Sequence, residues 1–462
     1  MKGSAIWSTF RILLFGVSLP IQALAVTVTS LNDSGPGSLR QAIADAPADG
    51  TIDFAVTGTI VLTSGQLIIT NDLTVNGPGA TELTISQNQS GRICLVSNAI
   101  VNLSGLTIAD GRAFGGNYYN WGGGIINFGT LSLENCTVSS NSAVFGGGVA
   151  NWDLGNLTLS NCVVSSNSAF EGGGGINNYG TLVIVVGSTI SGNVLGPPGL
   201  PGASLYGSGV HGGSLIISNS TVSSNQGGCG ITCFCGTVLI ANCTITGNGT
   251  YGLLHECSWP DSTVTIRNSI FSGNGGGSRS DCAGSFVSQD YNLIQNNYTD
   301  PFFNVSDASF TGATNHNIYG QDPKLGPLAD NGGPTTTHAL RFDSPAIDAG
   351  HSGGAAMDQR GLPRPIDDPN RPDAAGGDGC DMGAYEADPI LKVSGIEVTG
   401  AGVSVGFNTV LGRSYRLEAK TNLDNSWRTN SDNIPGTGSA NQTVNAGTAT
   451  VPQQFYRVRL LP

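Results

Sequence analysis

Short apolar phrases with alternating polar positions recur along the middle of the chain. Residues 131–141 read LSLENCTVSSN, and the phrase returns 26 residues later as LTLSNCVVSSN. In an extended chain Leu131 and Leu133 point to the same side. After a bend, Cys136 and Val138 share a second side. The pattern predicts two short strands and a corner, with a third strand near the glycines that follow.

An asparagine closes each phrase, and successive asparagines are 23 to 32 residues apart. The positions are Asn141, Asn167, Asn193, Asn225, Asn248 and Asn274. A coil of this length that contacts only its neighbours is a solenoid, and three short strands per coil predict a right-handed parallel β-helix. Roughly ten coils, each rising about 4.8 Å, make a rod about 50 Å long. We expect each asparagine to hydrogen-bond to the next one along the rod, which forms a ladder.

The repeat also divides the all-β chain into segments. The β-helix is expected over residues 51–297. Residues 26–50 are expected to cap it with a short helix, because Ser38 is a good N-cap and apolar residues follow at helical spacing. Residues 298–388 lose the repeat and are dense in Pro, Gly and Asp. Residues 389–462 return to alternating strands and predict a small β-sandwich-like module.

The first 25 residues have the pattern of a secretory signal peptide. Basic Lys2 and Arg11 precede or flank the apolar run ILLFGVSL, and Ala23-Leu24-Ala25 is a small-residue cleavage pattern. We therefore expect residues 1–25 to be removed and the protein to be secreted or held at the cell surface. No later segment has the roughly 18 apolar residues that a membrane span needs, so none is expected after cleavage.

The composition narrows the range of partners. Of 462 residues, 69 are glycine and only 11% are charged, with a formal net charge of −13. No lysine occurs between residues 112 and 280. Because phosphate binding needs clustered Lys and Arg, nucleic acid is excluded as a partner.

Three stretches resemble known bacterial families. The GGGV and GGGI phrases, paired with VSSN and FSGN, resemble the repeats of the chlamydial polymorphic outer-membrane proteins. SLRQAI at residues 38–43 resembles the CSLREA motif of related β-helix proteins, with Gly37 in place of the cysteine. Residues 321–386, which contain ADNGGPTTTHAL, SPAIDAG and CDMGAYE, resemble the choice-of-anchor Q domain of surface and secreted proteins. These resemblances imply an exported β-helix protein of the bacterial envelope, and they supply no catalytic motif.

All ten cysteines follow the signal pattern. Cys136 and Cys162 occupy one repeat position in neighbouring coils, and Cys243 occupies it further along, so buried free thiols are expected there. Export permits disulfides, and the candidates in or near turns are Cys229, Cys233, Cys235, Cys257 and Cys282. A zinc site at the C-x3-C-x-C stretch is the weaker alternative, because no fourth ligand has a suitable spacing.

An acidic run within the anchor-like segment is a candidate calcium site. Residues 367–381 read DDPNRPDAAGGDGCD, and the candidate ligands are Asp367, Asp373, Asp378 and Asp381. Calcium prefers several oxygen ligands, but the spacing is not that of an EF-hand loop, so a structural turn is the alternative. No cofactor is required by the predicted function, and Ca²⁺ is the one candidate ion.

Aromatic residues form two columns at the coil spacing. One column follows an asparagine and the other precedes the glycines; they are Phe128, Trp152 and Tyr179, and Trp121, Phe145 and Phe170. Packing within the rod is one interpretation, and a flat platform on which sugar rings stack is the other. On the second interpretation the ligand-binding residues are Trp121, Tyr118, Tyr119, Trp152 and Tyr179.

Titratable side chains are sparse in the coils, and no catalytic residue is assigned. The sequence therefore predicts a non-catalytic protein that binds polysaccharide or cell-surface glycan, or mediates adhesion. One alternative is a polysaccharide lyase or glycoside hydrolase with its site near Glu171 and His211 or around the loop at 196–209. The other alternative is a purely structural component of the envelope.

Overall fold

The structure is a computed structural model of the chain. The described residues are 25–87, 91–115, 120–196, 207–257, 262–277, 280–297, 308–368, 371–388, 391–399, 402–421, 426–439, 441–447 and 454–461. Over these residues the structure is built of strands, with a single α-helix, α1 (Leu39–Asp45). The expected signal peptide, apart from its last residue, lies outside them. No helix within these ranges is both long and apolar enough to cross a membrane.

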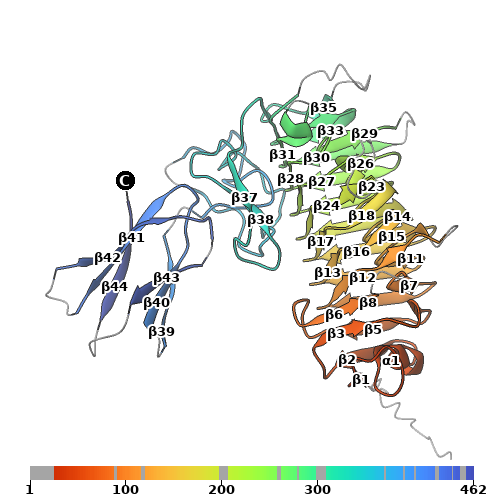
Figure 1. The fold of residues 1–462 in the computed structure, drawn as a ribbon. Coiled ribbons are helices and arrows are strands. Elements are labelled where there is room, and N and C mark those ends of the chain that lie inside the picture. Colours follow the sequence, from red (N-terminus) through yellow and green to blue (C-terminus); the bar gives the residue numbers. More distant parts are fainter. Residues whose placement is uncertain are drawn as a thin grey trace, which may run out of the picture.

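Residues 26–319 wind into a rod of stacked coils (Figure 1). One coil shows the order in which the chain visits the faces of the rod. Strand β12 (Thr130–Glu134) lies in sheet A, β13 (Thr137–Ser139) in sheet B, β14 (Ser142–Phe145) in sheet D and β15 (Val149–Trp152) in sheet C. Each of these strands pairs in parallel with its counterpart in the next coil, as a parallel β-helix requires.

The described strands of each sheet follow one another along the rod. Sheet A contains β1 (Val26–Val28), β2 (Gly50–Phe54), β5 (Leu73–Asn76), β8 (Ile100–Ser104), β12, β16 (Asn156–Ser160), β20 (Leu182–Val186), β24 (Leu215–Ser218), β27 (Thr237–Ala241), β30 (Thr263–Arg267), β33 (Ser285–Gln289) and β35 (Ser309–Ala313). Sheet B contains β3 (Gly58–Val61), β6 (Leu83–Ser86), β9 (Thr107–Ala109), β13, β17 (Val163–Ser165), β21 (Thr189–Ser191), β25 (Thr221–Ser223), β28 (Thr244–Thr246), β31 (Ile270–Ser272), β34 (Leu293–Ile294) and β36 (Ile318–Tyr319). Sheet C contains β4 (Leu67–Ile69), β7 (Cys94–Val96), β11 (Ile125–Asn127), β15, β19 (Ile176–Tyr179), β23 (Gly207–Gly212), β26 (Cys229–Cys233), β29 (Leu253–His255) and β32 (Cys282–Ala283). Sheet D contains β10 (Arg112–Ala113), β14, β18 (Ser168–Gly172) and β22 (Val194–Leu195).

The alternation of apolar residues fills the interior of the rod, as the sequence predicts. Leu131 and Leu133 are buried on sheet A, and Cys136 and Val138 are buried beside sheet B. The three expected strands per coil correspond to sheets A, B and C. Sheet D adds a fourth short strand in the middle coils, where residues such as 142–145 extend before the glycine turn. The sequence pattern does not predict this strand, because so short a strand has no alternation of its own.

The expected asparagine ladder is present and buried. Asn141 Nδ2 donates to Asn167 Oδ1 at 3.0 Å, and Asn167 Nδ2 donates to Asn193 Oδ1 at 3.0 Å. The same contact continues through Asn225 and Asn248 to Asn274. Each asparagine also donates to a backbone carbonyl of the preceding coil, so the ladder satisfies buried groups that would otherwise be unpaired.

The sequence predicts the N-terminal end of the rod better than the C-terminal end. At the N-terminal end Ser38 caps α1 by accepting from Gln41 N at 3.2 Å, and Leu39 and Ala42 are buried against the first coil. At the other end the rod continues beyond the expected boundary at residue 297, because β35 pairs with β33 and β36 pairs with β34. These last strands lack the repeated phrase, so a search for the repeat ends the rod too early.

The segment after the rod folds back across sheet B (Figure 1). It forms a small antiparallel pair, β37 (Leu325–Ala329) with β38 (Thr337–Leu340). Thr335 Oγ1 donates to Gly187 O at 2.9 Å, and Thr221 Oγ1 donates to Gln359 Oε1 at 2.6 Å. We call residues 320–387 the docked segment, because these contacts hold it against the rod.

The C-terminal residues form the small β module that the alternation predicts. Its described strands make two antiparallel sheets of three strands each. They are β39 (Val393–Thr399), β40 (Gly402–Phe407) and β43 (Gln442–Gly447), and β42 (Arg428–Pro435), β41 (Ser414–Lys420) and β44 (Phe455–Leu460). Val405, Phe407 and Leu417 are buried in its core.

Candidate functional site

The two aromatic columns meet on the outside of the rod. Trp121 stacks on Phe145, with ring centroids 4.2 Å apart and an interplanar angle of 15°. Trp121 also meets Trp152 edge-on at 4.1 Å, and Trp152 lies 5.4 Å from Tyr179. Trp121, Phe145 and Trp152 are partly exposed, and Tyr179 is 50% exposed. We call these four residues the aromatic cluster.

The asparagines of a second ladder set the position of Trp152 and Tyr179. Asn151 Nδ2 donates to Asn178 Oδ1 at 2.9 Å, and Asn127 Nδ2 donates to Asn151 Oδ1 at 2.7 Å. These asparagines are buried. Side chains alternate along a strand, so the aromatic residue after each buried asparagine faces outward. Trp152 and Tyr179 are paired in register, which places their rings one coil apart.

A buried arginine hydrogen-bonds to the backbone of Trp121, the first residue of the second aromatic column. Arg92 is 6% exposed, and its Nε and Nη2 donate to the carbonyl of Trp121 at 2.9 and 2.7 Å. Trp121 and Phe145 form a parallel β-bridge. The turn that follows needs glycine: Gly146 has φ +63°, and a Cβ there would lie 2.9 Å from the Cβ of Ala150. The glycine turn therefore lies close against sheet C and presents the aromatic side chains next to it.

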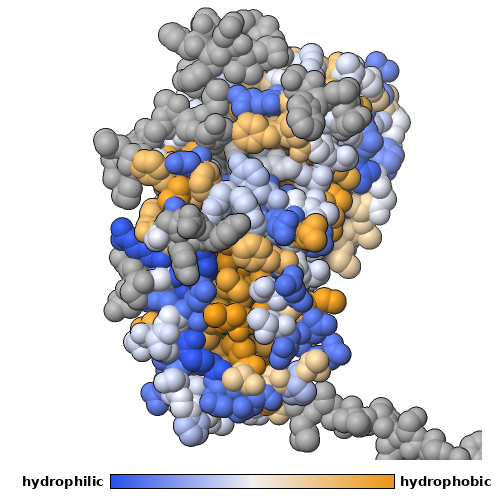
Figure 2. All heavy atoms as spheres, turned by 90° about the vertical axis from the view of Figure 1, so that its right-hand side faces the viewer, coloured by the Kyte–Doolittle hydropathy of each residue, from blue (hydrophilic) through white to orange (hydrophobic). Residues whose placement is uncertain are grey.

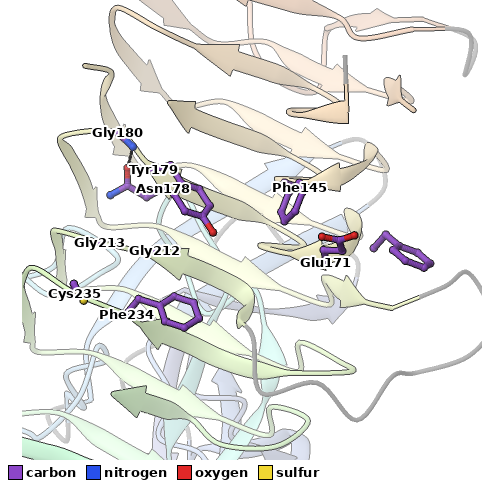
Figure 3. Close-up of a pocket in the computed structure, with 10 residues that line it drawn as sticks. Phe145, Glu171, Asn178, Tyr179, Gly180, Gly212, Gly213, Phe234 and Cys235 are labelled. Atoms are coloured by element: carbon purple, nitrogen blue, oxygen red, sulfur yellow. Dashed lines mark hydrogen bonds between the residues drawn. The ribbon is translucent and has the colours of Figure 1, made fainter. Parts of the chain in front are cut away.

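A pocket of about 790 Å³ adjoins the aromatic cluster (Figure 3). Its lining residues come from sheets C and D and their turns; they are Phe145, Phe170, Glu171, Asn178, Tyr179, Gly180, Gly212, Gly213, Phe234 and Cys235. Figure 3 shows Phe145, Tyr179 and Phe234 around the same hollow, with Glu171 on one side. A pocket of this size with mainly apolar and aromatic walls is typical of a small-ligand or oligosaccharide site.

Few charged groups reach this pocket. Glu171 is exposed at the end of β18 and is the one carboxylate among the lining residues. Asn178 uses its amide atoms in the ladder and in a bond to Ser214 O at 2.9 Å. The side chain of His211, on β23, lies outside what the structure describes. Residues 197–206 of the loop at 196–209 also lie outside it.

A buried amide beside the pocket has no partner. Asn177 precedes Asn178 on β19 and is fully buried. Neither its Nδ2 nor its Oδ1 has a hydrogen-bond partner within the described structure. It occupies the outward column of sheet C, in register with Ala150. An unsatisfied buried amide is uncommon and marks a place where a bound water or ligand group would be stabilised.

The same side of the rod is apolar near its N-terminal end. Figure 2 shows apolar surface over the lower coils, bordered by hydrophilic residues. The outward residue of β4 is Ile68, which is 55% exposed and in register with Leu95 of β7. Tyr118 and Tyr119, the remaining predicted platform residues, lie outside the described residues. Phe170 is 51% exposed, and a register shift between β14 and β18 keeps it out of the stack formed by Trp121 and Phe145.

The structure draws no disulfide bond, and it brings two of the five disulfide candidates close together. Cys229, Cys233 and Cys282 are buried in the rod, and burial raises the pKa of the first two to about 11 and about 12. Their register partners are glycine, histidine or leucine, so no thiol lies opposite them. Cys235 and Cys257, in turns one coil apart, are in hydrogen-bond contact and stay the one candidate pair.

The stacked cysteines of the repeat behave as expected. Cys136 and Cys162 are buried and donate to backbone carbonyls, to Glu134 O and Ser160 O at 3.3 Å, and Cys243 is buried further along. The alternative zinc site does not form in the described chain, because Cys229 and Cys233 face the interior while Cys235 is exposed.

The aspartates that lie together in the structure are not the four that the sequence predicts. Asp367 and Asp373 come together with Asp348, and one carboxylate oxygen from each lies within 4.8 Å of the others. Burial, with the charges of Asp368 and Asp367, raises the pKa of Asp348 to about 6.

The remaining two candidates of the acidic run are not part of this cluster. Asp378 accepts from the backbone N and hydroxyl of Ser352, and Asp381 is fully buried and accepts from Asp348 N at 2.9 Å. Gly376 and Gly379 have left-handed backbone conformations, with φ of +72° and +74°, which place turns between Asp373 and Asp381.

Comparison with known proteins supports the fold. The family model described as the right handed beta helix region matches residues 175–319. Together with the parallel pairing of sheets A, B and C, this match confirms the right-handed β-helix that the repeat predicts. No curated protein sequence matches the chain.

Solved structures show distant likeness of fold. Pectate lyase Pel9A is 15% identical, with 78% of this chain and 96% of that chain covered and a TM-score of 0.43. The Dettilon tailspike protein is 13% identical, with 89% and 79% covered and a TM-score of 0.36. The A-module of the Azotobacter vinelandii mannuronan C-5 epimerase AlgE4 is 11% identical, with 59% and 89% covered and a TM-score of 0.27. At these values the likeness carries no argument about function.

Proposed function

We propose that this protein binds a neutral polysaccharide along the aromatic side of its β-helix and does not cleave it. The observation that supports this proposal is the aromatic cluster itself. Trp121, Trp152 and Tyr179 are held in fixed positions by backbone and ladder contacts, yet they keep part of their rings exposed. Aromatic rings that serve only to fill a core are buried, whereas exposed rigid rings offer apolar surface to the C–H faces of sugars.

The charge of the site favours a neutral ligand. The lining of the pocket includes Glu171 and no lysine or arginine. The chain as a whole carries a formal net charge of −13. An acidic polysaccharide would be repelled by this balance, whereas a neutral one would be bound by apolar stacking and hydrogen bonds.

The scarcity of carboxylates supports binding without hydrolysis. Glycoside hydrolysis usually needs two carboxyl groups about 5–10 Å apart on either side of the scissile bond. Glu171 is the one carboxylate that the described lining of the pocket provides. The lyase or hydrolase alternative therefore has one candidate residue here where its chemistry requires a pair.

The setting we propose is the bacterial cell surface or the extracellular space. The secretory pattern of residues 1–25 and the resemblance of residues 321–386 to a choice-of-anchor Q domain support it. N-terminal sequencing of protein recovered outside the cytoplasm should then begin at Val26, and an intact Met1 would contradict export.

The decisive experiment removes one ring of the aromatic cluster. Trp152→Ala should lower the affinity for neutral polysaccharides by about two-fold to ten-fold in affinity electrophoresis, because one stacked ring contributes about 0.5–1.5 kcal/mol beyond its buried area. Trp427→Ala is the matched control, since Trp427 is a partly exposed tryptophan in the C-terminal module. Circular dichroism establishes that both variants keep the fold.

Two outcomes would count against the proposal. If Trp152→Ala binds every polysaccharide as the unchanged protein does, the aromatic cluster is a packing feature. If incubation of the unchanged protein with any polysaccharide releases new chain ends, the protein is an enzyme, and Glu171→Gln then becomes the first variant to assay.

A further inference from the structure

A buried carboxylate in the docked segment lacks a partner for one of its oxygens. Asp348 is fully buried, and its Oδ1 accepts from Asp368 N at 3.2 Å. Its Oδ2 is buried without any hydrogen-bond partner in the described structure. Burying an ionised oxygen in this way is costly, so a group that binds it is expected.

Two exposed carboxylates lie close to the carboxylate of Asp348. Asp367 and Asp373 are exposed at the surface, and their oxygens lie within 4.8 Å of each other and of Asp348. Calcium binds oxygens at about 2.3–2.6 Å, so two ligands on opposite sides of one ion are about 4.6–5.2 Å apart. The upper bound of 4.8 Å on these separations is compatible with calcium. An exposed, irregular loop also matches the flexible coordination that calcium accepts, whereas magnesium demands near-ideal octahedral geometry.

A glycine lies against these carboxylates. Gly379 has φ +74°, a conformation that residues with side chains rarely adopt, and a Cβ there would lie 3.1 Å from Asp367 Cβ. A side chain at this position would therefore strain the backbone and press on Asp367.

No basic side chain of the described chain forms an ion pair with the three aspartates. The guanidinium of the nearby Arg371 donates to Ser344 O at 2.7 Å and to Phe342 O at 2.8 Å, and without a direct ion pair its charge partly offsets the rise in the pKa of Asp348 that burial causes. One positive charge near three carboxylates leaves net negative charge for a cation.

We propose that Asp348, Asp367 and Asp373 bind one calcium ion, with water completing its coordination. Asp348 and Ala374 are joined by a backbone hydrogen bond of 2.9 Å, and Gly350 N donates to Cys380 O at 2.8 Å. The ion therefore fastens the exposed loop that carries Asp367 and Asp373 to the buried part of the docked segment. The proposed calcium site is separate from the polysaccharide site and does not depend on the proposed function.

The first test is calcium titration of the full chain after treatment with a chelator. Calorimetry should show one saturable site with a dissociation constant on the order of 10⁻⁴–10⁻³ M, because two of the three ligands are exposed. Calcium should also raise the melting temperature. Asp367→Asn and Asp373→Asn should each weaken binding about ten-fold or more. Both residues are exposed, so these substitutions leave the buried core unchanged.

The control is an aspartate of the same run that the structure places elsewhere. Asp378→Asn should leave calcium affinity unchanged, because the carboxylate of Asp378 is bound to Ser352. Asp348→Asn should abolish binding, with retained circular dichroism establishing that it still folds.

Terbium luminescence locates the ion independently. The hydroxyl of Tyr291 donates to Ala375 O at 3.0 Å, two residues from Asp373, so excitation of tyrosine should sensitise a bound terbium ion. Tyr291→Phe should reduce this emission while leaving calcium affinity unchanged. The proposal is overturned if no saturable calcium binding occurs, if Asp367→Asn and Asp373→Asn bind normally, if magnesium displaces calcium at equal concentration, or if the emission does not depend on Tyr291.

Discussion

The rod and the docked segment are stabilised in opposite ways. In the rod, the interior consists of stacked apolar columns and of ladders in which each asparagine bonds to its copy in the next coil. The docked segment has one short strand pair and relies on buried ion pairs. Arg364 Nε lies 2.7 Å from Glu386 Oε2 with both side chains fully buried, and Arg360 pairs with Asp358 in the same way.

Because of this difference, substitutions should affect the stability of the two regions differently. A residue in the rod meets an equivalent residue above and below, so one substitution disturbs a contact that is repeated many times. A residue in the docked segment meets a partner that occurs once. Removing that partner leaves a buried charge uncompensated, which is among the most destabilising changes in a protein.

The largest expected effect comes from breaking the buried pair of the docked segment. Arg364→Ala should lower the free energy of unfolding of this segment by about 3–5 kcal/mol, because the charge of Glu386 stays buried. Urea unfolding and limited proteolysis of residues 320–387 measure the change. Arg416→Ala is the control, since its pair with Asp432 is partly exposed and should contribute about 0–1 kcal/mol. Equal effects of the two variants would refute the contrast.

A smaller effect is expected from interrupting the asparagine ladder. Asn193→Ala removes the acceptor of Asn167 Nδ2 and the donor to Asn225, so it should cost about 1–3 kcal/mol in chemical unfolding. The control is Asn156→Ala, whose amide reaches only Leu154 O at 3.5 Å. If the two variants unfold alike, the ladder contributes less than its buried contacts indicate.

The smallest effect concerns pH at the contact between the two regions. His338 Nε2 bonds to Ser223 Oγ at 2.8 Å, its Nδ1 donates to Gly326 O, and burial lowers its pKa below the usual 6.5. Below that pH the unfolded chain takes up a proton that the folded imidazole does not, so stability falls as pH decreases.

The comparison with His338→Gln isolates this effect from other titrating groups. The unfolding free energies of the two proteins should diverge below pH 6.5, by up to about 1.4 kcal/mol for each pH unit. Parallel curves between pH 5 and 7.5 would show that His338 is protonated in the folded protein as well.

The candidate sites were predictable to different degrees. Trp121, Trp152 and Tyr179 are found from the repeat alone, because a residue at a fixed place in each coil must recur at a fixed place on the rod. The repeat does not show that the two aromatic columns meet, since that depends on how tightly the glycine turn folds onto sheet C.

The candidate calcium ligands were predicted less completely than the aromatic cluster. The acidic run contributes Asp367 and Asp373, but the third member, Asp348, lies 19 residues before Asp367 in a different phrase. Spacing along the chain cannot identify it, because the turns at Gly376 and Gly379 direct Asp378 and Asp381 away from the cluster.

The amino-acid pattern alone predicts the β-helix, its capping helix, its asparagine ladder and the C-terminal β module. In each case the contacts are local or repeat at one period, so composition and alternation specify them. Three features are visible only in the folded protein: the rod reaches Tyr319, the docked segment packs against sheet B, and Asp348 lies beside Asp367 and Asp373. These features depend on single contacts between distant residues, and no period in the chain encodes them.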